Sequence, residues 1–270
     1  MLTDILSTLK EGFKGLEFEA STHTYSDEYG TRFTSCTEFV KKFEYQKDWE
    51  EIRKKSAIKR IKKEKGQDYK PSDDEIAEHS EQLKTEWANA GQYAATLGTE
   101  VHAVMEYLWQ GKDYTGDQEA MSNFPGMPEE FEARKKIAIS LFNKMSKRYT
   151  PVANEFRIFD RDIKIAGTVD FIAYDRMNNE LVIIDWKSSK EFNKSAWKPD
   201  ELMSYPFNEY EDCNVNHYSL QLSTYKYIIE KNTGLKVGKL ILFQLPKPGH
   251  FTQSCECNDM TKELNLLFNY

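Results

Sequence analysis

Two strongly apolar segments on either side of a turn sequence constrain the fold of this chain most. The first segment is Gly167–Ile172, the second is Leu181–Lys187, and Asp175–Glu180 between them is rich in Asp and Asn. Such turn residues between two apolar runs predict an antiparallel hairpin. Because the second run is apolar from Leu181 to Ile184, we expect it to form a central strand. Charged residues such as Asp185 and Lys187 are rare in a buried strand unless they have a structural or functional role.

The hairpin predicts a pair of facing carboxylates. A hairpin symmetric about Met177 and Asn178 places Asp170 opposite Asp185, where Cβ atoms lie about 4.5–5.5 Å apart. Like charges at this separation repel each other, and a divalent cation such as Mg²⁺ would turn the repulsion into attraction. Lys187 alternates onto the same face as Asp185. The group suits metal-assisted phosphodiester hydrolysis, in which a lysine orients water or stabilises negative charge. The spacing alone also allows an ordinary Asp–Lys pair on a surface hairpin.

Two predicted helices carry further candidate residues. His102 follows Gly98 and Thr99 and shares a helix face with Glu106, four residues later. It is either a metal ligand or a structural histidine. Gln221 and Tyr225 are also four residues apart, and they either contact phosphates and bases or belong to an ordinary polar face.

The order of the remaining patterns predicts an α/β fold with an α-rich first half. We expect a β-hairpin over residues 16–34, charged helices over 47–66 and 72–88, a helix over 98–109 and another over 128–147. Residues 152–187 alternate in three runs, which predicts an antiparallel β-meander. A polar segment over 190–216, a helix over 218–231, a strand over 239–245 and a short C-terminal helix follow. We divide the chain into an N-terminal region, residues 1–95, and a core, residues 96–270.

Composition excludes several classes of protein. With 39% hydrophobic and 30% charged residues among 270, the chain has the composition of a globular protein, and no apolar run approaches the roughly 18 residues of a membrane span. Asp4, Glu11, Glu17 and Glu19 argue against a secretory signal or transit peptide. Four cysteines are too few for a disulfide scaffold. We therefore expect a cytoplasmic protein that is neither secreted nor bound to a membrane.

Because the net charge is −7, contact with nucleic acid requires a local patch of basic residues. One candidate lies in the segment Arg53–Lys65, whose basic residues would neutralise phosphates or form a solvated helix face. The candidate DNA-binding residues are Arg53, Lys54, Lys55, Lys59, Arg60, Lys62 and Lys63. A weaker candidate comprises Arg134, Lys135, Lys136, Lys144, Lys147 and Arg148. In the segment 190–216, the aromatic residues Trp197, Tyr205, Phe207 and Tyr210 would stack on bases or pack the segment onto the core.

Taken together, the motifs resemble the PD-(D/E)XK nuclease superfamily, and within it the RecB-like branch. The motifs Gly98-Thr99-x-x-His102, Gly167-x-x-Asp170, Asp185-x-Lys187 and Gln221-x-x-x-Tyr225 stand in the family's order, each on the expected element. The opening segment with His23-Thr24-Tyr25 is similar to that of phage-type relatives of the mitochondrial genome maintenance exonuclease. The resemblance covers about residues 20–245. It implies a restriction-endonuclease-like core, with a central mixed β-sheet flanked by helices.

The resemblance also implies roles for individual residues in a Mg²⁺- or Mn²⁺-dependent deoxyribonuclease. It implies four metal ligands: the side chains of His102, Asp170 and Asp185 and the main-chain carbonyl of Trp186. Lys187 would be the catalytic lysine, and Gln221 and Tyr225 would position the substrate and support the site. Glu155, on the strand before the hairpin, would be the additional acidic residue that some members use.

The resemblance further implies an exonuclease acting on single-stranded DNA ends or flaps, because helices outside the core of RecB-like enzymes guide a single strand. Replication or recombination proteins would be partners, in a bacterial or phage-infected cell. One alternative is a non-catalytic nucleic-acid-binding module on the same fold, although the chain retains every acidic residue and the lysine. Another is an iron–sulfur nuclease. The spacing of Cys36, Cys213, Cys255 and Cys257 argues against an iron–sulfur cluster, because Cys255 and Cys257 are too close in sequence.

Overall fold

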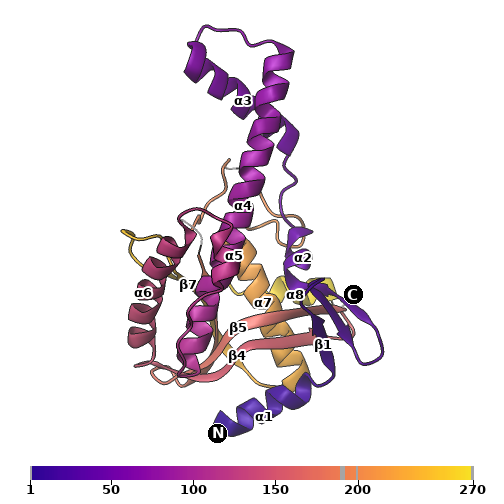
Figure 1. Ribbon diagram of the computed structural model, residues 1–270. Coiled ribbons are helices and arrows are strands. Elements are labelled where there is room, and N and C mark those ends of the chain that lie inside the picture. Colours follow the sequence, from indigo (N-terminus) through magenta and orange to yellow (C-terminus); the bar gives the residue numbers. More distant parts are fainter. Residues whose placement is uncertain (1, 189–191, 199, 269–270) are drawn as a thin grey trace.

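The computed structural model describes residues 2–188, 192–198 and 200–268. Its body is a mixed β-sheet with helices on both faces, and a two-helix hairpin projects from the body (Figure 1). The sheet is built on the predicted meander, in which β4 (Tyr149–Asp160), β5 (Ile165–Asp175) and β6 (Glu180–Lys187) run antiparallel. The mixed α/β architecture with a central sheet between helices is the one that the sequence predicts.

The second hairpin strand is central, as its apolar sequence predicts. Strand β7 (Val237–Gln244) pairs parallel with β6 on the side away from β5, and β8 (Ser254–Glu256) pairs antiparallel with β7. Alternate residues of β6 enter different hydrophobic clusters: Ile183 packs on one face of the sheet and Ile184 on the other. Burial on both faces explains why the strand has no polar alternation.

The edge of β5 opposite β4 is shared by two other strands, and this leaves a gap. Strand β4 pairs with β5 along its whole length, whereas β3 (Arg32–Ser35) reaches only Ile165 and Ala166, and β6 reaches only Phe171–Asp175. Between these two pairings, residues 167–170 have no strand partner on that edge among the described residues. Gly167 and Asp170 therefore lie where the sheet opens.

Helices cover the two faces as separate layers. Helices α1 (Leu2–Gly12), α2 (Cys36–Lys41), α7 (Asn214–Thr233) and α8 (Thr261–Phe268) pack on the larger hydrophobic cluster. Helices α4 (Asp73–Trp109), α5 (Gln118–Ser122) and α6 (Met127–Met145) pack on the other. Among the described residues, no helix has the length and apolar character needed to cross a bilayer.

Helix α4 is the longest element, and its continuity corrects the sequence prediction. Separate helices over 72–88 and 98–109 are wrong, because α4 runs for 37 residues without a break, about 55 Å. The segment between them contains Gly91 but no proline, so nothing removes a helical hydrogen bond. The boundary predicted between residues 95 and 96 lies inside this helix, and the division into two regions stays a prediction.

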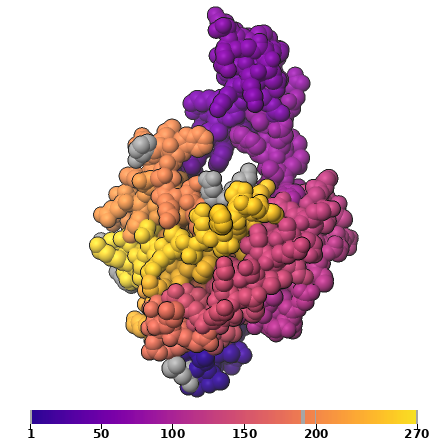
Figure 2. Space-filling model, turned by 90° about the vertical axis from the view of Figure 1, so that its left-hand side faces the viewer, coloured from indigo at the N-terminus to yellow at the C-terminus, as the bar shows by residue number. Residues whose placement is uncertain are grey.

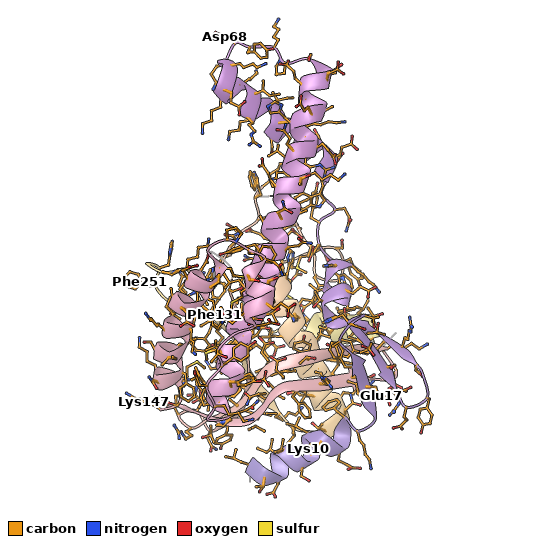
Figure 3. All side chains as sticks on the ribbon, in the orientation of Figure 1. Lys10, Glu17, Asp68, Phe131, Lys147 and Phe251 are labelled. Carbon is orange, nitrogen blue, oxygen red and sulfur yellow. The ribbon has the colours of Figure 1, made fainter. Side chains whose placement is uncertain are left out.

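The outer half of α4 pairs with α3 (Trp49–Lys65) to form the projecting hairpin, hereafter the α3–α4 hairpin. Ala57, Ile61 and Leu83 are buried between the two helices, and Ser72 begins α4 with a capping box to Glu75. Asp68 lies at the far tip of the hairpin (Figure 3). The base of the hairpin continues directly into the part of α4 that covers the sheet.

The N-terminal segment belongs to the same core. The hairpin predicted over 16–34 is a three-stranded meander of β1 (Leu16–Glu19), β2 (Thr24–Asp27) and β3, because the chain turns at His23, whose φ is 50°. Helix α1, which the sequence analysis did not predict, buries Leu9 and lies near Phe13 in the larger cluster. These strands connect to the rest of the sheet through the pairing of β3 with β5.

Candidate active site

The site begins where β5 and β6 separate. The hairpin has the register that symmetry about Met177 and Asn178 predicts, since Asp175 faces Glu180 and Phe171 faces Ile184. The ladder ends there, one pair before Asp170 and Asp185. Beyond it, the main-chain N–H of Trp186 donates to Asp170 Oδ2 over 3.0 Å. A carboxylate thus replaces the next strand partner and holds the end of β6 near β5.

Asp185 and Lys187 lie together at the end of β6, beyond its last pair with β5. The Lys187 ammonium is 2.7 Å from Asp185 Oδ2, and it also lies 4.5 Å from the centre of the Tyr218 ring on α7. The Asp185 side chain is 2% exposed, and its Oδ1 has no hydrogen-bond partner among the described residues. A buried carboxylate oxygen without a partner is costly in a folded protein, so a bound cation would stabilise Asp185.

His102 reaches the same place from the other face of the sheet. A Cβ atom at Gly98 would lie 3.1 Å from Ser188 Oγ, so the glycine lets α4 approach the end of β6 closely. One turn later, His102 Nδ1 is 3.4 Å from Asp170 Oδ2. Burial lowers the pKa of His102 to about 4, and the Lys187 ammonium acts in the same direction. The imidazole is therefore neutral near pH 7, which is the form that binds metals.

Gln221 and Tyr225 complete the floor of the site. Gln221 Nε2 donates to the Tyr225 hydroxyl over 2.9 Å, and the buried Tyr225 ring lies directly over β5. A Cβ atom at Gly167 would lie only 2.6 Å from Tyr225 Cε1, so this position requires glycine. Burial raises the pKa of Tyr225 well above its ordinary value, so the hydroxyl stays protonated.

Acidic groups concentrate around the junction. Burial and the carboxylate of Asp170 raise the pKa of Asp185 to about 6, and burial also raises the pKa of Asp170. Glu155 occupies the β4 position between the pairs that flank Asp170, and its φ of 43° is unusual for a non-glycine residue. Burial of its carboxylate and the charges of Asp170 and Glu106 raise the pKa of Glu155, although the residue as a whole is exposed. These groups repel one another, so cation binding would relieve the repulsion.

Comparison with known families agrees with this geometry. The family model of the PD-(D/E)XK nuclease superfamily matches residues 76–264, more than two thirds of the chain. The chain belongs to the PD-(D/E)XK nuclease superfamily. No curated protein matches the sequence. Membership implies a nuclease with a nucleic acid substrate, and members of this superfamily generally use divalent metals such as Mg²⁺.

The residues of this PD-(D/E)XK site fit such a metal through hard oxygen donors. Among the described residues, Asp185 Oδ1 is buried without a hydrogen-bond partner, Asp170 adds a second carboxylate, and His102 Nδ1 lies 3.4 Å from Asp170 Oδ2. Within the described part of the chain, no three His, Cys, Asp or Glu side chains form a group that would hold a metal ion by themselves. A metal here would therefore complete its coordination with a main-chain carbonyl, water and substrate oxygens, as Mg²⁺ usually does.

The predicted basic segment lies far from this site. Arg60 on α3 binds Glu86, which precedes His102 by sixteen residues, or roughly 24 Å along α4. Lys54 and Lys55 pair with Glu50 and Glu51 on their own helix. In the described part of the chain, no carboxylate lies within 4.0 Å of the remaining basic residues of the segment: Arg53, Lys59, Lys62 and Lys63.

Three of the six residues of the weaker basic candidate form structural ion pairs, whereas Lys136, Lys144 and Lys147 are exposed. Arg134 is buried and binds Glu130, Lys135 pairs with Asp113, and Arg148 binds Asp175. The aromatic residues of the segment 190–216 divide into two kinds. Phe207 is buried and Tyr210 packs on the core, whereas Trp197 is 90% and Tyr205 71% exposed.

The structure brings two further residues to the PD-(D/E)XK site: Glu106, to which the sequence assigned a helix face but no role, and Tyr218, which the sequence did not predict. Glu106 raises the pKa of Glu155, and Tyr218 contacts the Lys187 ammonium. The spacing of four residues from His102 placed Glu106 on the correct face of its helix. No local pattern marks Tyr218, because its contact depends on how α7 crosses the end of β6.

Proposed function

We propose that the protein is a Mg²⁺- or Mn²⁺-dependent deoxyribonuclease that acts on single-stranded ends or flaps. The observation that carries the proposal is Asp185, a buried carboxylate with one oxygen that has no hydrogen-bond partner among the described residues. It lies beside the Lys187 ammonium, and the charge of Asp170 raises its pKa. Structural ion pairs satisfy both partners, as Asp175 and Arg148 do. At Asp185, by contrast, Oδ1 is free to coordinate a cation.

In this proposal, Asp170, Asp185, His102 and the Trp186 carbonyl hold the cation. When bound, the cation supplies a more acidic water and polarises the phosphate. The Lys187 ammonium supplies a fixed positive charge for the negative charge that develops on the phosphate oxygens. Tyr225 remains a neutral hydrogen-bond donor, and Gln221 orients its hydroxyl.

The shape of the molecule favours a single strand as substrate. A cavity of about 760 Å³ lies directly beside Lys187 and His102, between α4 and residues that follow β6 and β7. In the space-filling view, an opening separates the base of the α3–α4 hairpin from the body (Figure 2). The cavity has the size of a small-ligand pocket, far less than a duplex requires. Lys59, Lys62 and Lys63 share a face of α3, where they would hold the phosphates of a strand several nucleotides from the site.

A cleavage assay with end-labelled DNA tests the proposal. Linear single strands, blunt duplexes, flapped duplexes, circular single strands and RNA of the same sequence are incubated with Mg²⁺, with Mn²⁺ or with EDTA. We expect metal-dependent loss of the linear single strand and the flap, with the circle and the blunt duplex resistant. Cleavage of the circle would indicate an endonuclease, and preferential cleavage of RNA would change the substrate class. Binding of single strands with no cleavage under any condition would favour a non-catalytic binding module.

A further inference from the structure

The cavity beside Lys187 differs in character from the acidic site next to it. Small side chains of α4, among them Ala90 and Ala94, form one wall, and the rings of Tyr93, Phe124 and Tyr218 form others. Lys247 lies on its lining and is 43% exposed at the side chain. The described residues that line the cavity thus combine apolar and aromatic surface with positive charge, and none is acidic.

The walls of the cavity are held in place by a hydrogen-bond network. Tyr93 donates to Glu130 over 2.7 Å, and Glu130 binds Arg134 through both Nε and Nη2. The buried Arg134 in turn donates to the main-chain carbonyls of Ser188 and Leu245, both over 3.0 Å. This network fixes α4, α6 and the ends of β6 and β7 relative to one another. The cavity is therefore preformed, as ligand sites usually are.

The composition of the lining selects the kind of group that fits. A flat aromatic ring packs on aromatic and small apolar side chains, and a phosphate attached to it pairs with a lysine. The Tyr93 and Phe124 rings pack edge to face, with their centroids 5.8 Å apart, and both rings line the cavity, where they offer aromatic surface to a ligand. The Lys247 ammonium lies 3.8 Å from Glu130, at the limit of an ion pair, so it remains available to an anion.

We propose that this cavity is a nucleobase subsite, which holds the base of a nucleotide next to the scissile phosphate while Lys247 binds a neighbouring phosphate. The inference rests on the proposed function and deepens it, because it adds a binding site for one unstacked base of the substrate strand. Ala90 and Ala94 are required to be small because larger side chains would occupy the space of the base.

The test combines a filled cavity with a missing base. Ala94→Phe places a ring in the cavity from an exposed helix position, and Ala88→Phe, which does not line the cavity, is the matched control. Each variant and the wild type cleave a single-stranded oligonucleotide that is intact or that has one abasic residue, placed in turn at each of the two positions on either side of the scissile bond. Removing a base that stacks on protein weakens the interaction about tenfold or more.

We expect the wild type and Ala88→Phe to cleave the intact strand at least tenfold faster than one of the abasic strands. Ala94→Phe should cleave the intact strand and that abasic strand at the same reduced rate. Lys247→Ala should raise KM and lower the salt dependence for every strand by about one phosphate contact. A wild type indifferent to base removal at all four positions would overturn the inference, as would an Ala94→Phe variant that keeps the preference. Failure of the proposed function is distinct, because the wild type would then cleave no strand at all.

Discussion

At the residue scale, the site depends on carboxylates that local sequence symmetry could reveal. Asp170, Asp185 and Lys187 were predictable because hairpin register and strand alternation are set by nearby residues. The contact between Lys187 and Tyr218 was not predictable, because it requires the packing of α7 against the end of β6. Long-range packing also decides that Gly167 must lack a side chain, since Tyr225 lies above it.

Lys187→Ala should lower kcat by about 10²- to 10³-fold, the loss that follows removal of one group stabilising transition-state charge. The fold should survive, because the ammonium is bound to a single carboxylate. Single-turnover cleavage of labelled DNA measures the effect. Lys239→Ala is the matched control, since Lys239 is also a strand lysine beside a carboxylate, Glu256, but lies on β7 outside the site. Activity of Lys187→Ala within threefold of wild type would remove the lysine from the mechanism.

The turn of the hairpin depends on the ion pair between Arg148 and Asp175. Arg148 Nε donates to Asp175 Oδ1 over 3.0 Å and Nη2 to Oδ2 over 2.6 Å, and the Asp175 side chain is fully buried. Arg148→Met should lower the free energy of unfolding by about 3 kcal/mol, the lower end for removing one partner of a buried pair. Urea denaturation at pH 7 measures this, with the exposed Arg32→Met as the control.

The same pair predicts a dependence on pH. The Arg148 guanidinium, together with the Met177 main chain, holds the pKa of Asp175 below its ordinary value of 3.8 against the opposing effect of burial. A lowered pKa stabilises the fold above about pH 4, and this stabilisation is lost as the pH falls through the folded-state value. The difference in stability between wild type and Arg148→Met should therefore shrink at pH 3. A difference that is constant with pH would contradict the assignment.

At the element scale, the meander was predictable from periodicity and α3 from its composition, whereas the extent of α4 was not. The three runs of the meander alternate clearly and form β4, β5 and β6. Helix α3 has only a thin apolar stripe, but it is rich in Lys and Glu, which are good helix formers. The sequence predicted separate helices over 72–88 and 98–109, and the segment between them contains Gly91. The helix continues because glycine weakens but does not end a helix that tertiary contacts hold at both ends.

Gly91→Ala should stabilise the protein by up to about 1 kcal/mol, because alanine is the better helix former and a Cβ atom there meets nothing within 4 Å. Gly30→Ala is a matched control, since a Cβ atom at Gly30 also meets nothing within 4 Å but its φ is +79°. That substitution should destabilise the protein. Urea denaturation compares the two. Loss of stability in Gly91→Ala would mean that α4 is not continuous at this position.

At the scale of the whole molecule, the proposed function requires an acidic protein to bind nucleic acid through positive charges placed far apart. The net charge is −7, and Glu86, the α4 residue that binds Arg60 of α3, lies roughly 24 Å from His102 along α4. The α3–α4 hairpin gives the protein reach beyond its catalytic core. In the proposed function, a strand held by both α3 and the site would run along the α3–α4 hairpin.

Replacing Lys59, Lys62 and Lys63 by Gln should raise KM for single strands and reduce the slope of log kcat/KM against log salt by about 2, since each phosphate contact contributes about 0.7. Chemistry at the site should be unaffected, so kcat should stay the same. Replacing Lys54 and Lys55 by Gln is the control, because carboxylates of α3 already bind both lysines at 2.7 Å. Equal salt slopes for wild type and triple variant would exclude this face from the path of the strand.

The most direct measurement compares cleavage of a labelled single strand by wild type, Asp185→Asn and the exposed-site control Asp200→Asn, with Mg²⁺ and with EDTA. We predict activity only with Mg²⁺, and a loss of at least a hundredfold in Asp185→Asn alone, more than the loss of an outer partner of a metal ligand costs. Asp185→Asn should remain folded in EDTA, because the amide oxygen can still accept a hydrogen bond from Lys187 and the repulsion between Asp170 and Asp185 is removed. Cleavage by Asp185→Asn at the wild-type rate would contradict the assignment of this carboxylate as the centre of the site.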